Sequence, residues 1–275
     1  MFFPRLITAI IGIPLVIGSV YWGSIPFFVF LLGIVILALQ EYYMLAKTSG
    51  YDCRPVLGTV MGTLLFVMLF LSGTVVVAPV LHNATAAFMS FMLMPLLLLE
   101  IIRPTHEKAS ERLGITFLGA FFIPWALGHL ALIRSFRPLG MEYVLFLFLT
   151  IWFLDTGAYA IGIKYGRLKL APSVSPKKTI EGAIGGTIIG IITALVLRVL
   201  LLRSALTISE TIGITAVLSV VAQFSDLSES LFKREAGVKD SADLLPGHGG
   251  MFDRFDSFLF TAPLLYYYLS IFKGM

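Results

Sequence analysis

The stretch IEGAIGGTIIGIITALVLRVLLL, residues 180–202, is apolar along nearly its whole length and carries only Glu181 and Arg198 as charged residues. About 20 mostly apolar residues in a helix are needed to cross the hydrocarbon core of a bilayer. Hydrocarbon offers no partner to backbone N–H and C=O groups, so a helix, which bonds them internally, is the expected form. The stretch therefore predicts a transmembrane helix.

Similar apolar stretches lie on both sides of this one. The composition agrees, because 58% of the 275 residues are hydrophobic and 13% are charged, against about 25% charged residues in soluble domains. We therefore expect an all-α, polytopic integral membrane protein with about nine transmembrane helices. They span residues 6–22, 25–44, 56–78, 83–102, 113–133, 143–163, 180–202, 209–232 and 255–272.

The lysines and arginines indicate the orientation of these segments. With nine spans, the N-terminus and the even-numbered connections hold most of the 20 Lys and Arg residues. The positive-inside rule then places the N-terminus in the cytoplasm of a multi-pass protein of the cell membrane. It also explains the net charge of +4 without nucleic-acid binding. A single cysteine, Cys53, excludes an intramolecular disulfide and a cysteine-based metal site.

Charge is concentrated in residues 230–256, SLFKREAGVKDSADLLPGHGGMFDRFD, which we call the signature loop. We expect residues 1–140 to supply about five helices for packing or dimerisation, and residues 141–275 to form a catalytic region that includes this loop. Charge at a membrane edge is costly unless it is used. Cations and carboxylates around a Gly-His-Gly-Gly turn predict a cytoplasmic phosphate site with a divalent metal. His248 is either a phosphate donor or a structural residue.

Several carboxylates fall at helical spacing beside the loop. One helix face of residues 209–232 and beyond carries Gln223, Asp226, Glu229, Ser230 and Lys233. That stripe predicts either an interhelical hydrogen-bonding face or, as we favour, a wall of a hydrophilic cavity. Asp253 and Asp256, three residues apart, either begin a helix or join Asp226 around Mg²⁺, which binds to one or two carboxylates and substrate phosphates.

A second cytoplasmic loop ends in Lys177 and Lys178, directly before the helix of residues 180–202. Two lysines at a helix N-terminus are unfavourable for the helix dipole, and a bound anion would reverse this penalty. The lysines therefore form either an anion-binding site or part of the ordinary positive charge of a cytoplasmic loop. The GxxxG spacing that begins at Gly182 and continues through residues 186 and 190 predicts close helix packing.

Four other polar residues lie within the spans or near their ends. Asp155 and Tyr159 lie one turn apart within the sixth span, and either a functional or a structural role fits them. Glu41 and Glu100 lie near span ends, which favours interfacial positions.

The signature loop resembles that of the phosphatidate cytidylyltransferases, or CDP-diacylglycerol synthases. The matching residues read Ser230-x2-Lys233-Arg234-x4-Lys239-Asp240-x-Ala242-x2-Leu245-Pro246-x-His248-Gly249-Gly250-Met251-x-Asp253-Arg254-Phe255-Asp256. Ser175-Pro176-Lys177-Lys178-Thr179-x-Glu181-Gly182 and Asp155-Thr156-Gly157-Ala158-Tyr159 are also similar to motifs of that family. The resemblance covers about residues 150–260.

The resemblance implies a membrane enzyme of phospholipid biosynthesis that converts CTP and phosphatidate to CDP-diacylglycerol and pyrophosphate. It implies Mg²⁺ as cofactor and allows a monovalent cation such as K⁺ beside it. Metal ligands would be Asp226 and Asp253, followed by Asp256. Lys233, Lys239 and His248 would join the first two in catalysis. Substrate would be held by Lys177, Lys178, Ser230, Arg234, Asp240, Gly249, Gly250 and Arg254.

Two other functions remain open from the residues alone. A related CTP-dependent lipid enzyme, such as a CDP-archaeol synthase or a polyprenol kinase, would use the same carboxylates and lysines on another lipid. An ion-coupled transporter would use Asp155, Asp226 and Glu229 as an ion path. The second is less favoured, because transport does not need a dense, mixed-charge cytoplasmic loop.

Overall fold

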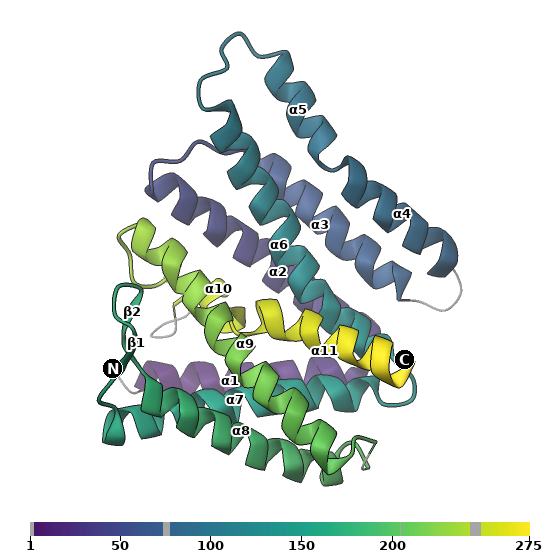
Figure 1. The fold of residues 1–275 in the computed structure, drawn as a ribbon. Helices are drawn as coiled ribbons and strands as arrows, with labels where there is room; N and C mark the ends of the chain where they lie inside the picture. The colour runs from purple at the N-terminus through teal and green to yellow at the C-terminus, as the bar shows by residue number, and fades with distance from the viewer. Residues whose placement is uncertain (1–2, 74–77, 204, 243–248) are drawn as a thin grey trace. The chain divides into compact units, whose positions relative to one another are not determined.

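The computed structural model describes residues 3–73, 78–203, 205–242 and 249–275. It consists of helices and one small hairpin (Figure 1). The elements are α1 (Phe3–Trp22), α2 (Ser24–Thr48), α3 (Pro55–Ser72), α4 (Ala78–Phe91), α5 (Leu93–Ile101), α6 (Ala109–Ser135), α7 (Gly140–Tyr165), β1 (Lys169–Ala171), β2 (Ser175–Thr179), α8 (Ile180–Leu200), α9 (Ile208–Glu235), α10 (Phe252–Phe255) and α11 (Phe258–Lys273). The expected all-α membrane class is confirmed.

Each of the nine expected segments overlaps a helix, and residues 74–77 of the third lie outside the described residues. Within the described residues, seven helical segments are long and apolar enough to cross a membrane. They are α2, α3, the α4–α5 segment Asn83–Ile101, α6, α7, α8 and α9. The remaining two are α11, with 16 residues, and α1, whose apolar part within the described residues is the shorter Ile10–Trp22. The count of nine is therefore approximate.

The fourth expected span is broken at Met92 into α4 and α5. Pro95 explains the break, because its ring has no N–H and collides with the carbonyl of the residue four positions earlier in a continuous helix. That residue is Phe91, the last of α4.

The chain forms two compact units. The N-terminal unit consists of Met1–Ser135 and Phe232–Phe255, and the C-terminal unit consists of Phe136–Leu231 and Asp256–Met275. Most of the signature loop thus belongs with the N-terminal helices. The functional division at residue 140 stays a prediction, since compactness alone does not assign a role.

In the N-terminal unit, α2, α3 and α6 pack on one another. Tyr43 of α2 is buried and its hydroxyl donates to the carbonyl of Thr116 on α6, at 2.7 Å. Gly62 of α3 lies so close to its neighbours that an added Cβ would stand 3.1 Å from the carbonyl oxygen of Ala120. Close approach and side-chain-to-backbone bonds therefore fix the three helices.

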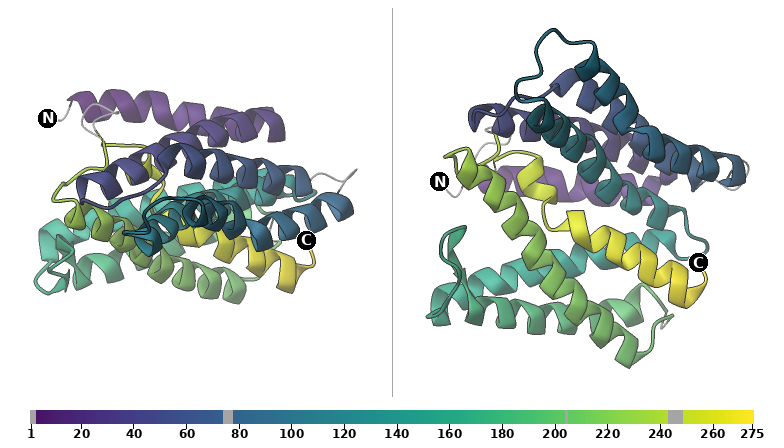
Figure 2. Two further views of the ribbon diagram at one scale, coloured as in Figure 1. Left: turned by 90° about the horizontal axis from the view of Figure 1, so that it is seen from above. Right: turned by 45° about the horizontal axis from the view of Figure 1, so that its top comes forward.

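In the C-terminal unit, α7 and α8 run side by side, as both views of Figure 2 show. A Cβ on Gly182 would lie 2.7 Å from the carbonyl oxygen of Ala158, and one on Gly186 would lie 2.8 Å from that of Leu154. The predicted glycine packing face is confirmed. Isoleucines 184, 188 and 192 are more than half exposed on the outer face of α8, as a lipid-facing surface requires.

Candidate functional site

The loop between α7 and α8 is an antiparallel hairpin that leads directly into α8. Thr179 caps the helix, because its hydroxyl accepts from the backbone N–H of Gly182 at 3.2 Å. Glu181 accepts from the backbone N–H groups of Arg167 and Leu168, at 3.0 and 3.1 Å. These bonds hold the start of α8 and the strand that carries the two lysines in one fixed geometry.

Lys178 of this hairpin forms an ion pair with Asp226 of α9. Lys178 Nζ lies 2.7 Å from Asp226 Oδ2, and the two side chains are 25% and 29% exposed. The other oxygen of Asp226 accepts from Ser230 Oγ at 3.4 Å. Lys177 is exposed. The structure therefore brings Lys178 together with Asp226 and Ser230, two residues that the sequence had placed on one helix face without linking them to this lysine.

Asp256 lies against the same helix. Its Oδ1 accepts from the backbone N–H of Ser257 at 2.5 Å, and its backbone carbonyl accepts from Ser225 Oγ. Because Ser225 directly precedes Asp226, the C-terminal unit places these two predicted ligands on segments that touch.

The signature loop of the N-terminal unit is organised by Asp253. Its Oδ1 accepts from Lys233 Nζ at 2.6 Å, and the two side chains are 4% and 10% exposed, respectively. Its Oδ2 accepts from the backbone N–H and the hydroxyl of Ser241, both at 2.9 Å, and from the backbone N–H of Gly250 at 2.8 Å. A charge this deeply buried is tolerated because it is paired and hydrogen-bonded.

Gly249 and Gly250 are required by the geometry of the loop itself. Gly249 has a φ of +74°, which favours glycine, and an added Cβ would strike Asp253 Oδ2. An added Cβ on Gly250 would strike Glu41 Oε2 and Ser241 Oγ. Their expected contact with substrate stays a prediction.

Glu41 of α2 is the site residue that sequence reasoning missed. It is 5% exposed, and it accepts from the backbone N–H groups of Met251 and Phe252, both at 2.8 Å. A carboxylate within an apolar span was the available signal, but its place near the span end favoured an interfacial role. Glu100, expected at the same kind of position, is also 5% exposed.

Four other charged residues of the loop face solvent. Arg234, Lys239, Asp240 and Arg254 are exposed. Arg234 donates to the carbonyl of Val238 at 3.0 Å. Lys239 and Arg254 have no ion pair among the described residues, so both are available to an anionic ligand. His248 lies outside the described residues.

The candidates for an ion path differ in their surroundings. Asp155 and Tyr159 of α7 are exposed, whereas Glu229 of α9 is fully buried. An ion path would need these polar side chains to line one buried route. Asp155 and Glu229 instead lie on different helices and differ in burial, which does not favour transport.

Similarity to known proteins extends over the whole chain. Residues 3–272 match the model of the cytidylyltransferase family. The chain belongs to this family. It is 31% identical to the phosphatidate cytidylyltransferase of Bacillus subtilis over 269 residues, which cover 98% of both chains. It is 34% identical to that of Staphylococcus haemolyticus over 262 residues, covering 95% of this chain and 96% of the relative.

Identity is higher where the match is shorter. The chain is 49% identical to the phosphatidate cytidylyltransferase of Staphylococcus saprophyticus over 129 residues. This match covers 47% of this chain and 49% of the relative's length. Membership of the cytidylyltransferase family confirms the resemblance seen in the motifs, and it extends that resemblance to the N-terminal helices that carry Glu41.

The carboxylates of this family member suit Mg²⁺ to different degrees. Asp226 is partly exposed and one oxygen has only a 3.4 Å hydrogen bond, so it can accept a hard cation. Asp253 Oδ2 already accepts hydrogen bonds from three donors. A metal would therefore bind at Oδ1, which also pairs with Lys233. Among the described residues, no three His, Cys, Asp or Glu side chains cluster closely enough to hold a metal. Substrate phosphates would have to complete the coordination.

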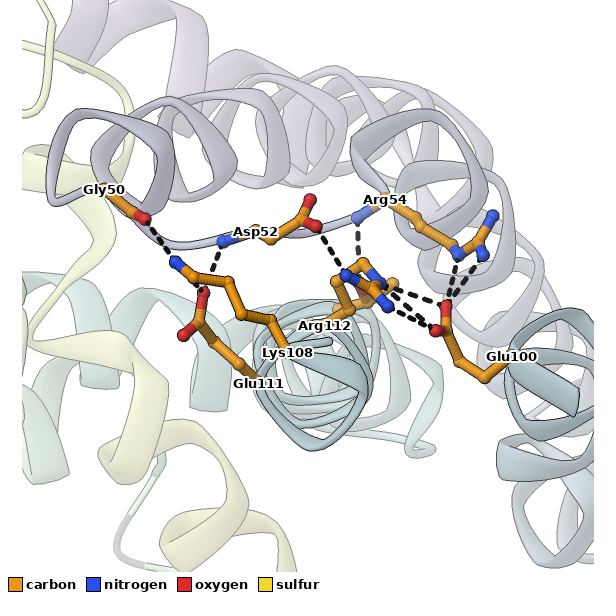
Figure 3. A network of polar contacts seen from close by, with 8 residues as sticks. Gly50, Asp52, Arg54, Glu100, Lys108, Glu111 and Arg112 are labelled. Atoms are coloured by element: carbon orange, nitrogen blue, oxygen red, sulfur yellow. Dashed lines mark hydrogen bonds and ion pairs between the residues drawn. The ribbon is translucent and has the colours of Figure 1, made fainter. Parts of the chain in front are cut away.

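A second charged cluster in the N-terminal unit joins the loop between α2 and α3 to helices α5 and α6 (Figure 3). Arg112 lies 2.7 Å from Glu100 and 2.6 Å from Asp52, and Arg54 also pairs with Glu100 at 2.7 Å. Arg112 and Glu100 side chains are 5% and 6% exposed. Such a buried network depends on all its members, because a lone remaining charge is costly.

The same loop contacts the end of α9 through Tyr51, whose hydroxyl donates to Glu235 Oε1. That hydrogen bond raises the pKa of the Tyr51 phenol, and the negative charge of Glu235 adds to the effect. Tyr51 thus stays protonated at neutral pH and keeps donating to the helix that begins the signature loop.

Proposed function

We propose that the chain is a phosphatidate cytidylyltransferase of phospholipid biosynthesis, which joins the cytidylyl group of CTP to phosphatidate and releases pyrophosphate. The observation that carries the proposal is the match to relatives of that name over nearly the full chain. It is supported by the signature loop, in which the Lys233–Asp253 pair is buried while Arg254 and Lys239 remain exposed to ligand.

The reaction needs little covalent help from the protein. The phosphate monoester of phosphatidate has a second pKa near 6 and is largely a dianion at pH 7. One of its oxygens attacks the α-phosphorus of CTP, the bond from that phosphorus to the oxygen bridging to the β-phosphate breaks, and pyrophosphate leaves. No proton has to be removed from the nucleophile. The obstacle is the repulsion between two anions, so positioning and charge neutralisation carry the catalysis.

The residues would share this work as follows. The exposed Lys239, Arg254 and Lys177 would hold the phosphates, with Lys178 joining them from its pair with Asp226. Asp226 and Asp253 would hold Mg²⁺, with Asp256 as a further ligand. The chemistry that bound Mg²⁺ supplies is neutralisation of phosphate charge and stabilisation of the departing pyrophosphate.

Topology and partners complete the proposal. The reaction would take place on the cytoplasmic side, where the positive-inside rule places both charged loops. Phosphatidate would reach it from the bilayer. A monovalent cation such as K⁺ and a homodimer formed through the N-terminal helices are further proposals that the resemblance and the apolar helices motivate.

The decisive experiment uses purified protein in detergent with phosphatidate, CTP labelled in the cytosine ring, and Mg²⁺. We expect label in the lipid phase, in a product that migrates as CDP-diacylglycerol, with one pyrophosphate released per lipid. A folded protein that labels archaetidic acid but not phosphatidate would overturn the choice of lipid, as would one that transfers the γ-phosphate of CTP to a polyprenol and leaves the cytosine label in CDP. Ion uptake into proteoliposomes without CTP consumption would overturn the enzyme.

A further inference from the structure

Glu41 makes more contacts with the signature loop than its place in the second apolar helix suggests. Both of its carboxylate oxygens are used. Oε1 accepts from the N–H of Met251, and Oε2 accepts from the N–H of Phe252 and from Ser241 Oγ, at 2.8, 2.8 and 2.7 Å. Its side chain is nearly inaccessible to solvent. All of these groups belong to the N-terminal unit.

The first two bonds fix the start of α10. Phe252 is its first residue and Met251 precedes it, so their N–H groups have no partner within the helix. Glu41 supplies the acceptor that a capping side chain would normally supply, from a position about 200 residues earlier in the chain. The turn that presents Asp253 and Arg254 is therefore held by α2.

The third bond reaches Asp253 itself. Ser241 Oγ lies 2.7 Å from Glu41 Oε2 and 2.9 Å from Asp253 Oδ2, and its single proton is shared between the two carboxylates. Gly250 makes room for this arrangement, because any Cβ there would strike both Glu41 and Ser241. Movement of Glu41 would consequently shift Oδ2 of Asp253 and rotate Oδ1, the oxygen that faces Lys233.

We propose that Glu41 is a positioning residue for cytidylyl transfer: through Met251, Phe252 and Ser241 it sets the orientation of Asp253 and Arg254. The effect on turnover rests on the proposed function, whereas the effect on the loop does not. The N-terminal helices would then complete the site instead of serving packing alone.

The test compares Glu41→Gln with Gln40→Ala, an exposed neighbour on the same helix. Glutamine keeps the size of Glu41 but replaces one acceptor with an NH₂ group, so one of the two backbone N–H groups faces a donor. Amide hydrogen exchange is followed in residues 249–256 and, as a reference, in α8. We expect exchange in the loop to rise at least about 10-fold in Glu41→Gln only, with α8 unchanged.

Kinetics supply the second measurement. Residues that orient metal-binding groups typically change activity or metal affinity by about 10–100-fold. We expect kcat in Glu41→Gln to fall by about that factor, and the Mg²⁺ concentration for half-maximal activity to rise about 10-fold. A purely structural role would reduce the amount of folded enzyme but would not move the Mg²⁺ dependence.

Several outcomes would overturn the proposal. Wild-type loop exchange in Glu41→Gln would do so, as would a loss of activity that tracks folded protein alone. If Glu41→Gln does not accumulate, Ser241→Ala tests the link to Asp253, and unchanged turnover and Mg²⁺ dependence there would refute it. Wild-type protein that fails to label lipid would reject the proposed function, while the exchange measurement would still decide the role of Glu41.

Discussion

Lys178 Nζ lies 2.7 Å from Asp226 Oδ2, so the strand before α8 and the polar end of α9 meet through an ion pair. Each side chain keeps at least a quarter of its surface exposed, and neither charge is deeply desolvated. A pair of this kind contributes about 0–1 kcal/mol to stability. Lys178 belongs to a family motif and the resemblance implies Asp226 as a metal ligand, so we propose that the pair serves ligand binding.

Replacing Asp226 with Asn separates these two roles. We expect Asp226→Asn to lower turnover at least about 100-fold, because a lost metal ligand removes several kcal/mol of transition-state stabilisation. Its melting temperature should stay within a few degrees of wild type. Lys169→Gln, on the exposed part of the same hairpin, is the control and should keep full activity. Near-normal turnover in Asp226→Asn would remove Asp226 from the metal site.

Asp253 should behave differently, because it is buried with Lys233. Removing one partner of a buried ion pair costs about 3–5 kcal/mol, so we expect Asp253→Asn to lose thermal stability as well as turnover. The double variant Asp253→Asn with Lys233→Met should recover much of the stability and none of the activity. An unchanged melting curve in the single variant would contradict the buried pair.

The contrast between these two aspartates shows what the sequence could predict. Helical spacing and the family resemblance identified Asp226, Asp253 and the lysines. The long apolar stretches located the helices, and the GxxxG spacing located the glycine face of α8. The sequence could not pair Lys178 with Asp226, because turn geometry decides which of two adjacent lysines points inward. Nor could it find Glu41, since a contact across 200 residues leaves no local pattern.

Chelation tests the cofactor independently of any substitution. We expect excess EDTA to abolish CDP-diacylglycerol formation and added Mg²⁺ to restore it, because two anionic substrates must be brought together. The measurement is label transfer at a series of free Mg²⁺ concentrations. Full activity in EDTA would refute the metal role, and the lysine and arginine side chains would then have to neutralise the phosphates alone.

The glycine face of α8 makes a prediction about stability. A Cβ on Gly186 would lie 2.8 Å from the backbone oxygen of Leu154, which cannot move without shifting α7. We expect Gly186→Ala to lower the free energy of unfolding by about 1–3 kcal/mol. Gly213→Ala in α9, where nothing lies within 4 Å, should raise it by up to about 1 kcal/mol. Equal effects at the two sites would argue against close α7–α8 packing.

The Arg112 cluster allows the sharpest separation of stability from catalysis. Within the part of the chain that the structure describes, Glu100→Leu leaves the buried Arg112 with Asp52 as its remaining ion-pair partner, and it should cost about 3–5 kcal/mol. Adding Arg112→Met removes the stranded charge, so the double variant should be more stable than Glu100→Leu, with a coupling energy of about 0.5–3 kcal/mol. Thermal unfolding in detergent measures both, with the exposed Glu107→Gln as control. Because no member of the cluster lies in the signature loop, kcat per folded molecule should stay unchanged, and a selective loss of kcat would instead tie this cluster to the chemistry.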